Sequence, residues 1–162
     1  MTVSAGELSD SEALWRFSLG FFARPGVSEA LIALQDRARC DVNLMLFALW
    51  LGVSGRSRLT NEELEIADRI ARPIRREIVE PLRALRRKLS SAPDRDVQRL
   101  REGIKALERA AEKVIQDRLG SAARPAFGDA DPAARAAVAC ANLARSSEAA
   151  TIGKALEVFL RG

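Results

Sequence analysis

The sequence predicts an all-α protein that folds as a single-domain helical bundle. Along most of the 162 residues, apolar side chains recur at spacings of three and four, as the buried face of a helix requires. Helix-capping patterns precede several of these runs, and no segment alternates apolar and polar residues as a half-buried strand does. We expect an aromatic N-terminal part, a long antiparallel helical hairpin and two short C-terminal helices, over 9–53, 60–119 and 131–161 respectively.

The N-terminal part is predicted to form a unit of three short helices. Residues 9–12, Ser-Asp-Ser-Glu, have the spacing of a capping box, so the first helix should begin near there and end at a Pro-Gly break. A second helix is expected over 27–38 and a third over 42–53, with Asp41 as its N-cap. The third is apolar almost throughout and should be covered on most sides. Helices of about 12 residues are unstable alone in water, so the three should pack together.

A Gly/Ser/Arg turn over 52–58 separates this unit from a long helical pattern. Residues 60–63, Thr-Asn-Glu-Glu, form a second capping box at its start. Pro73 and Pro81 lie inside the pattern and should kink or briefly break the helix. Its apolar stripe comprises Ile66, Ile70, Ile74, Ile78, Leu82, Leu85 and Leu89.

The second helix of the hairpin should follow a turn at 90–94. Its apolar stripe comprises Val97, Leu100, Ile104, Leu107, Ala111 and Val114. The short connection makes the two stripes natural antiparallel partners. Gly103 lies near this seam and costs about 1 kcal/mol relative to Ala, so we expect a close helix approach there. After an irregular stretch, Asp131-Pro132 predicts the start of the first C-terminal helix.

Several chemistries are excluded by composition. The chain has no His and no Tyr, which removes Ser-His-Asp and Cys-His sites and zinc sites built from Cys and His. No glycine-rich phosphate loop and no aspartate-rich D-D-x-x-D segment occurs. The carboxylates over 62–68 lie in the first turns of a helix, where the helix dipole favours them. We therefore expect no catalytic residues, no metal and no cofactor.

Cysteine usage and hydropathy favour a cytoplasmic protein without a membrane span. The two cysteines, Cys40 and Cys140, are too few for a disulfide framework and lie in apolar surroundings. The N-terminal ten residues lack the basic start of a secretory signal. The apolar run 42–53 is shorter than the roughly 20 residues that a transmembrane helix needs.

An Arg-rich stretch, 69–88, is the first candidate contact surface. It contains eight basic residues against two glutamates, in a chain whose net charge is only +4. On a regular helix, five of its arginines would share one side. They are Arg69, Arg72, Arg76, Arg83 and Arg87. This ridge could be a solvated or internally paired face, could bind an acidic protein partner, or could contact nucleic acid or an anionic membrane surface.

A polar set near the start of the third helix is the second candidate site. It comprises Gln35, Asp36, Asp41 and Asn43, with Trp15 and Trp50 nearby in the predicted unit. If the amide and carboxylate face inward, they need partners, because an unpaired buried amide costs about 1–3 kcal/mol. These residues are therefore either polar struts that hold the helices together or the lining of a pocket. The two tryptophans are expected mainly in the core.

Several motifs resemble a known family. The motif-bearing segments are Leu14–Leu19, Pro25–Val27, Leu34–Asp36 and Asp41–Trp50, with looser likeness over Pro81–Arg87 and Glu108–Glu112. Together they are similar to a family of short proteobacterial helical proteins that is classed as a domain of unknown function. The resemblance implies a bacterial cytoplasmic origin. It supplies no activity, substrate or catalytic residue.

Three functions remain open from the sequence. The first is a non-enzymatic helical interaction protein that acts through a protein partner or as a homo-oligomer. The second is a module that binds nucleic acid or acidic lipid through the Arg ridge. The third is a small-molecule enzyme that uses Asp36, Asp41 or Asn43 in a helical pocket.

Overall fold

The computed structural model describes residues 8–38, 41–56 and 60–123, and throughout these ranges the regular structure is helical. The elements are α1 (Asp10–Phe22), α2 (Val27–Ala38), α3 (Val42–Val53), α4 (Asn61–Ile74), the π-helix η1 (Arg75–Val79), α5 (Glu80–Lys88) and α6 (Arg95–Ser121). The predicted all-α fold is confirmed over this part of the chain. The helices expected within 131–161, and both cysteines, lie outside the described residues.

Side-chain caps explain where the helices begin. The Ser9 hydroxyl accepts the backbone N–H of Glu12 at the start of α1, and Thr60 and Glu63 form the full reciprocal capping box of α4. Asp41 caps α3 by accepting two backbone N–H groups. Between α1 and α2, Gly26 adopts a φ of 79°, in the left-handed region that glycine enters without steric cost. The predicted caps of these three helices are thus confirmed.

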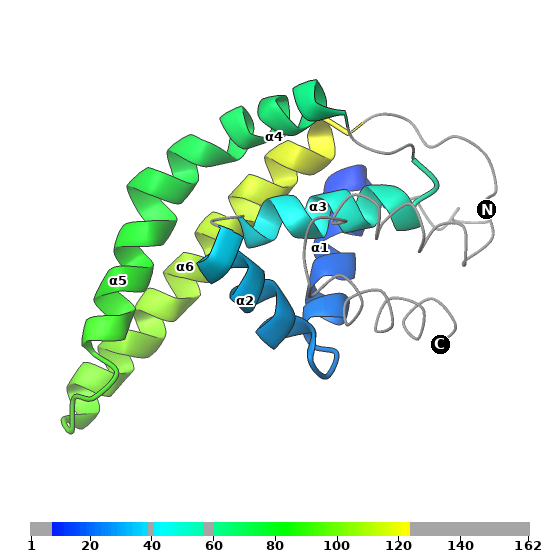
Figure 1. Cartoon of the computed structure of the whole chain (residues 1–162). Coiled ribbons are helices and arrows are strands. Elements are labelled where there is room, and N and C mark those ends of the chain that lie inside the picture. The colour runs from blue at the N-terminus through cyan, green and yellow to red at the C-terminus, as the bar shows by residue number, and fades with distance from the viewer. Residues whose placement is uncertain (1–7, 39–40, 57–59, 124–162) are drawn as a thin grey trace, which may run out of the picture.

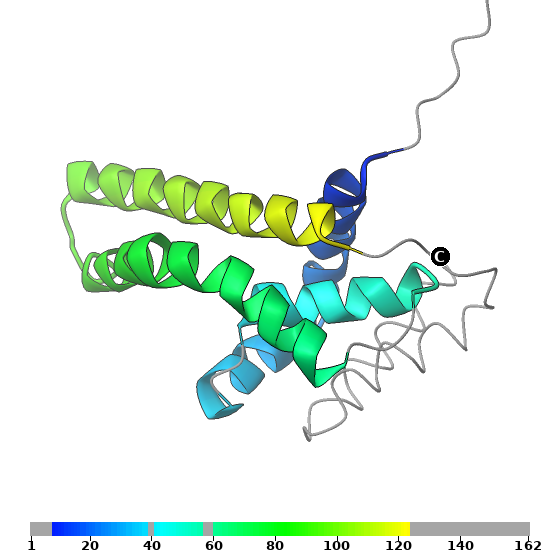
Figure 2. The same ribbon diagram turned by 90° about the horizontal axis from the view of Figure 1, so that it is seen from above.

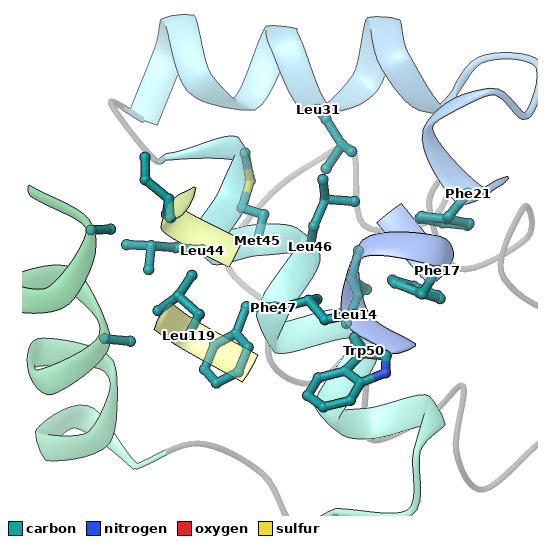
Figure 3. Close-up of a cluster of buried hydrophobic side chains, with 14 of the residues drawn as sticks. Leu14, Phe17, Phe21, Leu31, Leu44, Met45, Leu46, Phe47, Trp50 and Leu119 are labelled. Atoms are coloured by element: carbon teal, nitrogen blue, oxygen red, sulfur yellow. The ribbon is translucent and has the colours of Figure 1, made fainter. Parts of the chain in front are cut away.

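Helix α3 forms the centre of the hydrophobic core. Every residue from Asn43 to Val53 is buried, as its nearly uniform apolar sequence predicts. Figure 3 shows its side chains among those of α1, α2 and the end of α6, including Leu14, Leu31 and Leu119. The N-terminal unit is therefore closed by the last turns of the hairpin, and the two parts share one core.

The α5–α6 hairpin extends away from this core. Both views show α5 and the first half of α6 projecting beyond the other helices as a two-helix arm (Figures 1 and 2). At 1.5 Å per residue the 27 residues of α6 span about 40 Å, so the helix reaches from the tip of the arm to the core. No residue of α5 is buried. No helix in the described ranges is both long and apolar enough to cross a membrane.

The helix that the sequence predicts to bend at its prolines contains a π-helical turn. Pro73 lies in the last turn of α4, Pro81 lies in the first turn of α5, and η1 lies between them. Proline lacks a backbone N–H and its ring crowds the preceding turn, and a π-turn is one way to accommodate such a disturbance. One additional residue in a turn rotates the following side chains by about 100° relative to a regular helix. The side chains of α5 therefore face other directions than helical periodicity from α4 predicts.

The predicted seam of the hairpin is only partly correct. Ile74, Ile104 and Ala111 are buried as expected. However, six of the thirteen stripe residues face solvent and are 42–60% exposed: Ile66, Ile78, Leu85, Leu100, Leu107 and Val114. Leu107 faces outward because the neighbouring Glu108 points from α6 toward α5. There, Arg83 and Arg86 bind the Glu108 carboxylate. This polar contact, rather than Leu107, occupies the middle of the interface.

The close helix approach expected at Gly103 is wrong. Apart from its chain neighbours and the backbone of its own helix, no atom lies within 4 Å of the position that a Cβ on Gly103 would take. The close approach occurs instead at Gly120, where a Cβ would lie 2.6 Å from the Cα of Ser11. Ser11 also donates a hydrogen bond from its hydroxyl to the carbonyl of Asp117, at 2.8 Å. Glycine at position 120 therefore lets α1 cross α6 in direct backbone contact.

Candidate functional site

The two candidate sites of the sequence analysis meet at one concavity. It has a volume of about 410 Å³ and lies between the end of α2, the start of α3 and the η1–α5 segment. Its lining comprises Gln35, Asp36, Asp41, Val42, Asn43, Arg75, Val79, Glu80, Arg83, Ala84 and Arg87. Four members of the predicted polar set and two of the predicted arginines thus share one hollow. The two tryptophans are not part of its lining.

Asp41 is a cap and a strut at the same time. Its Oδ1 accepts the backbone N–H groups of Asn43 and Leu44 at 2.7 and 3.2 Å, and its Oδ2 accepts a hydrogen bond from Arg75 at 3.1 Å. A second guanidinium nitrogen of Arg75 donates to Asp68 at 2.9 Å. Both oxygens of Asp41 are therefore engaged, which weighs against its use as a catalytic base.

Arg75 is held between these two carboxylates. Burial alone would lower the pKa of Arg75, but its hydrogen bonds and ion pairs with Asp68 and Asp41 outweigh burial and raise that pKa above its usual value. Burial likewise opposes ionisation of Asp68, yet Arg72 and Arg75 hold the pKa of this carboxyl below its usual value. Arg75 was not among the predicted site residues, because on a regular helix it lies to one side of the ridge that the other five arginines form.

A network of arginines and glutamates links α5 to α6. Arg83 donates to Glu108 at 2.9 Å and to Glu112 at 3.0 Å, and Arg86 donates to Glu108 at 2.6 Å. Burial would raise the pKa of Glu108, but the hydrogen bonds and charges of the two arginines lower it overall. The pKa of Glu112 is raised, first by burial and then by the charge of Glu108, although Arg83 opposes the shift.

Asn43 is braced from behind by Gln116 on α6. The side-chain amide of Gln116 donates to the side-chain oxygen of Asn43 at 3.0 Å, and both residues are buried. Within the described residues the Gln116 side-chain oxygen has no hydrogen-bond partner. An unsatisfied buried oxygen lowers the free energy of unfolding by about 1–3 kcal/mol. The Asn43–Gln116 pair therefore fixes the packing of α3 on α6 but reduces stability.

The predicted Arg ridge does not form one continuous face. Arg72 pairs with Asp68, and Arg83 turns inward to its two glutamates. Arg69 and Arg76 are exposed, and no described residue forms an ion pair with either. The π-turn explains the division, because it rotates the arginines that precede it relative to those that follow. Only Arg83 and Arg87 of the five line the concavity.

The two tryptophans belong to the packing of the N-terminal unit. Trp50 is buried, and the guanidinium of Arg56 lies 4.4 Å from its ring centre. Arg56 also donates to Asp10 at 2.7 Å, which ties the end of α3 to the start of α1. Trp15 is half-buried, and the Lys113 ammonium lies 5.7 Å from its ring.

Charged side chains around the hollow tie helices to one another. Most charges beside the hollow are engaged in ion pairs. In the portion of the chain that the structure describes, no group of three or more Cys, Asp or Glu side chains is placed to hold a metal ion. The sequence did not single out three residues of the network, Arg86, Glu108 and Glu112, nor Gln116 behind Asn43. The spacing of four between the two glutamates was a signal, but it could be used only once the register of α5 against α6 was known.

Comparisons with known proteins identify a family and no activity. The model of the family described as "Protein of unknown function (DUF2390)" matches residues 13–119, from α1 to the last turn of α6. The searches of curated proteins and of solved structures gave no match.

Proposed function

The chain belongs to this family of unknown function, and because membership supplies no activity, we propose from its own surface that it is a non-enzymatic helical protein that works by self-association. The observation that carries the proposal is an apolar face on the projecting hairpin. We define this outer face by Ile78, Leu85, Leu100, Gly103, Leu107, Ala110 and Val114. Its five large side chains are 42–60% exposed.

The outer face lies on one side of the hairpin. At about 100° per residue, positions 100, 103, 107, 110 and 114 follow one side of α6. Arg83 and Glu112 meet along one edge of the hairpin. In an antiparallel pair with this contact, the side chains of Leu85 on α5 and Leu107 on α6 both point toward the opposite edge. Each lies about a quarter turn from the line that joins the two helix axes. Apolar side chains from both helices therefore point the same way, away from the concavity.

A second copy of the chain is the occupant that this face fits best. Large residues, Leu100, Leu107 and Val114, alternate on α6 with the small residues Gly103 and Ala110. Such a surface is self-complementary, because the large side chains of one copy can enter the gaps over the small residues of the other. The open space beside Gly103 is one such gap. Two hairpins paired in this way would form a four-helix bundle with two-fold symmetry.

The dimensions support a stable pairing. From Leu100 to Val114 the face is about 21 Å long, and two adjacent helices are about 20 Å wide. A face of this size can form the core of a standard interface, which buries about 800 Å² per partner. Burial of exposed leucines at about 25 cal/mol per Å² would supply the driving force.

Sedimentation equilibrium of the full chain over a range of concentrations tests the proposal. We expect a monomer–dimer equilibrium that Leu107→Gln shifts to monomer, with helix content by circular dichroism unchanged because the side chain is exposed. The control is Leu19→Gln, at a position on α1 that is 49% exposed and outside the outer face. A wild-type protein that stays monomeric, or two variants with equal effects, would contradict self-association.

The other functions considered from sequence have less support. The divided Arg ridge lacks the continuous basic surface that several phosphate contacts require. Catalysis by Asp41 is disfavoured because both of its oxygens are already bonded. A cytoplasmic location remains part of the proposal and rests on composition alone.

A further inference from the structure

We propose that the concavity between α2, α3 and α5 is a binding site for a small zwitterion, a molecule with an oxyanion at one end and an ammonium group at the other. This inference is independent of self-association, because the outer face and the concavity lie on opposite edges of the hairpin. Its basis is the disposition of charged side chains around the hollow.

Unpaired groups of opposite charge line the same space. Arg87 and Asp36 both face the concavity, and within the described residues neither side chain takes part in an ion pair. Opposite charges within about 4 Å of each other would count as a pair, so the Asp36 carboxylate and the Arg87 guanidinium do not contact each other. A molecule that carries both charges can satisfy both groups at once, which neither a simple anion nor a simple cation can do.

The oxyanion end of the site is Arg83 and Arg87, one helical turn apart on α5. Two nitrogens of Arg83 are engaged by Glu108 and Glu112, which orient its guanidinium and leave Nη1 available. No group in the described part of the chain bonds to the guanidinium of Arg87. A phosphate or carboxylate between these side chains would receive charge-assisted hydrogen bonds from both.

We assign the ammonium end to Glu80 and Asp36, the two carboxylates of the lining that accept no hydrogen bond from Arg75. Among the described residues, Glu80 forms an ion pair with Arg75 alone, at 3.9 Å, and other nitrogens of Arg75 bind Asp41 and Asp68. Glu80 precedes Arg87 by seven residues, about 10.5 Å along the helix. Both side chains are long enough to reach a small molecule with charged ends that lies between them.

A polar donor lies on the opposite wall of the site. The oxygen of the Asn43 side chain is occupied by Gln116, and no described group accepts a hydrogen bond from its nitrogen. Because Asn43 lines the hollow, this amide can donate to a hydroxyl or carbonyl in the middle of the ligand.

The charge balance of the lining selects against nucleic acid. Arg75, Arg83 and Arg87 are matched in number by the carboxylates of Asp36, Asp41 and Glu80. A run of phosphates would meet uncompensated carboxylates at Asp36 and Glu80 and be repelled. Net neutrality with separated charges fits a zwitterion.

Isothermal titration calorimetry of the full chain with phosphoethanolamine, inorganic phosphate and ethanolamine tests the site. We expect phosphoethanolamine to bind at least about tenfold more tightly than either half, and Arg87→Gln and Glu80→Gln each to weaken it about tenfold. The control is Arg76→Gln, which removes an exposed arginine outside the lining and should leave the affinity unchanged.

Other outcomes would overturn the proposal. These are no binding of any probe at millimolar concentration, phosphate alone binding as tightly as phosphoethanolamine, or an equal loss in the Arg76 variant. Since Arg87 and Glu80 are exposed, thermal unfolding should confirm that their variants remain folded. Leu107→Gln separates the two proposals, because a monomeric variant should still bind phosphoethanolamine.

Discussion

At the scale of single residues, Glu108 is the polar group on which the hairpin depends. Its side chain is 9% exposed and binds two arginines of α5, which lower its pKa. Its neighbour Glu112 binds one arginine among the described residues, Arg83, and burial raises its pKa. Two glutamates one turn apart on the same helix thus have pKa values shifted in opposite directions, because only Glu108 has enough partners to offset the loss of water.

These shifts predict how stability depends on pH. A carboxyl whose pKa falls on folding adds stability above its unfolded pKa of about 4.3 and loses it as pH falls through the folded value. Glu108→Gln should therefore lower the free energy of unfolding by about 2–3 kcal/mol at neutral pH. The difference from wild type should shrink as pH falls below about 4. Urea unfolding across this pH range measures both effects.

Glu112→Gln provides the matched comparison. The raised pKa means that ionised Glu112 destabilises the fold as pH rises from the unfolded to the folded pKa, so removing its charge lifts that penalty. Glutamine can still accept a hydrogen bond from Arg83. We expect a clearly smaller loss at neutral pH than for Glu108→Gln, and equal losses would show that Glu108 has no special role.

At the scale of elements, the crossing of α1 over α6 decides how the N-terminal unit joins the hairpin. The helices meet at Gly120, where a side chain would collide with the backbone of Ser11. Buried Arg56 adds a second tie to α1 through Asp10. Backbone atoms cannot move aside as a flexible side chain can, so this crossing tolerates little change.

Alanine at two glycines of the same helix should have opposite effects. Gly120→Ala should lower the free energy of unfolding by about 1–3 kcal/mol through overpacking. Gly103→Ala, in open space on an exposed helix, should raise it by up to about 1 kcal/mol. Chemical unfolding in the Leu107→Gln background, which removes the proposed association, compares the two. Equal destabilisation by both substitutions would contradict the crossing.

At the scale of the whole molecule, the projecting two-helix arm is less buried than the packed body around α3. Helix α3 is buried from Asn43 to Val53, whereas α5 has no buried residue. Local opening is easiest where few apolar contacts must break. The arm therefore gains more than the body from a partner that covers its outer face.

Hydrogen exchange should resolve this difference. At low protein concentration, amides of α5 should exchange faster than those of α3. Raising the concentration should slow exchange in α5 and in the Leu100–Val114 part of α6, with little change in α3, because association covers only the arm. Exchange in the arm that does not depend on concentration would count against the proposed pairing.

Local chemistry determined where the helices lie. Caps such as Asp41 and Thr60, and the spacing of apolar residues, act within a few positions of the chain, so the all-α fold and the ends of α2 and α3 could be predicted from sequence. The candidate residues Asp36, Asp41 and Asn43 were also identified, from their polarity beside an apolar helix. Their purpose could not be identified, because it depends on partners far along the chain.

Tertiary packing decided which faces are buried and which side chains meet. The π-turn at 75–79 rotated the arginines that follow it and so divided the Arg ridge, and the register of α5 against α6 placed Glu108 between two arginines. Leu107 consequently faces outward, on the proposed pairing surface. These outcomes depend on small rotations and on contacts between residues more than 20 positions apart, which helical periodicity alone does not encode.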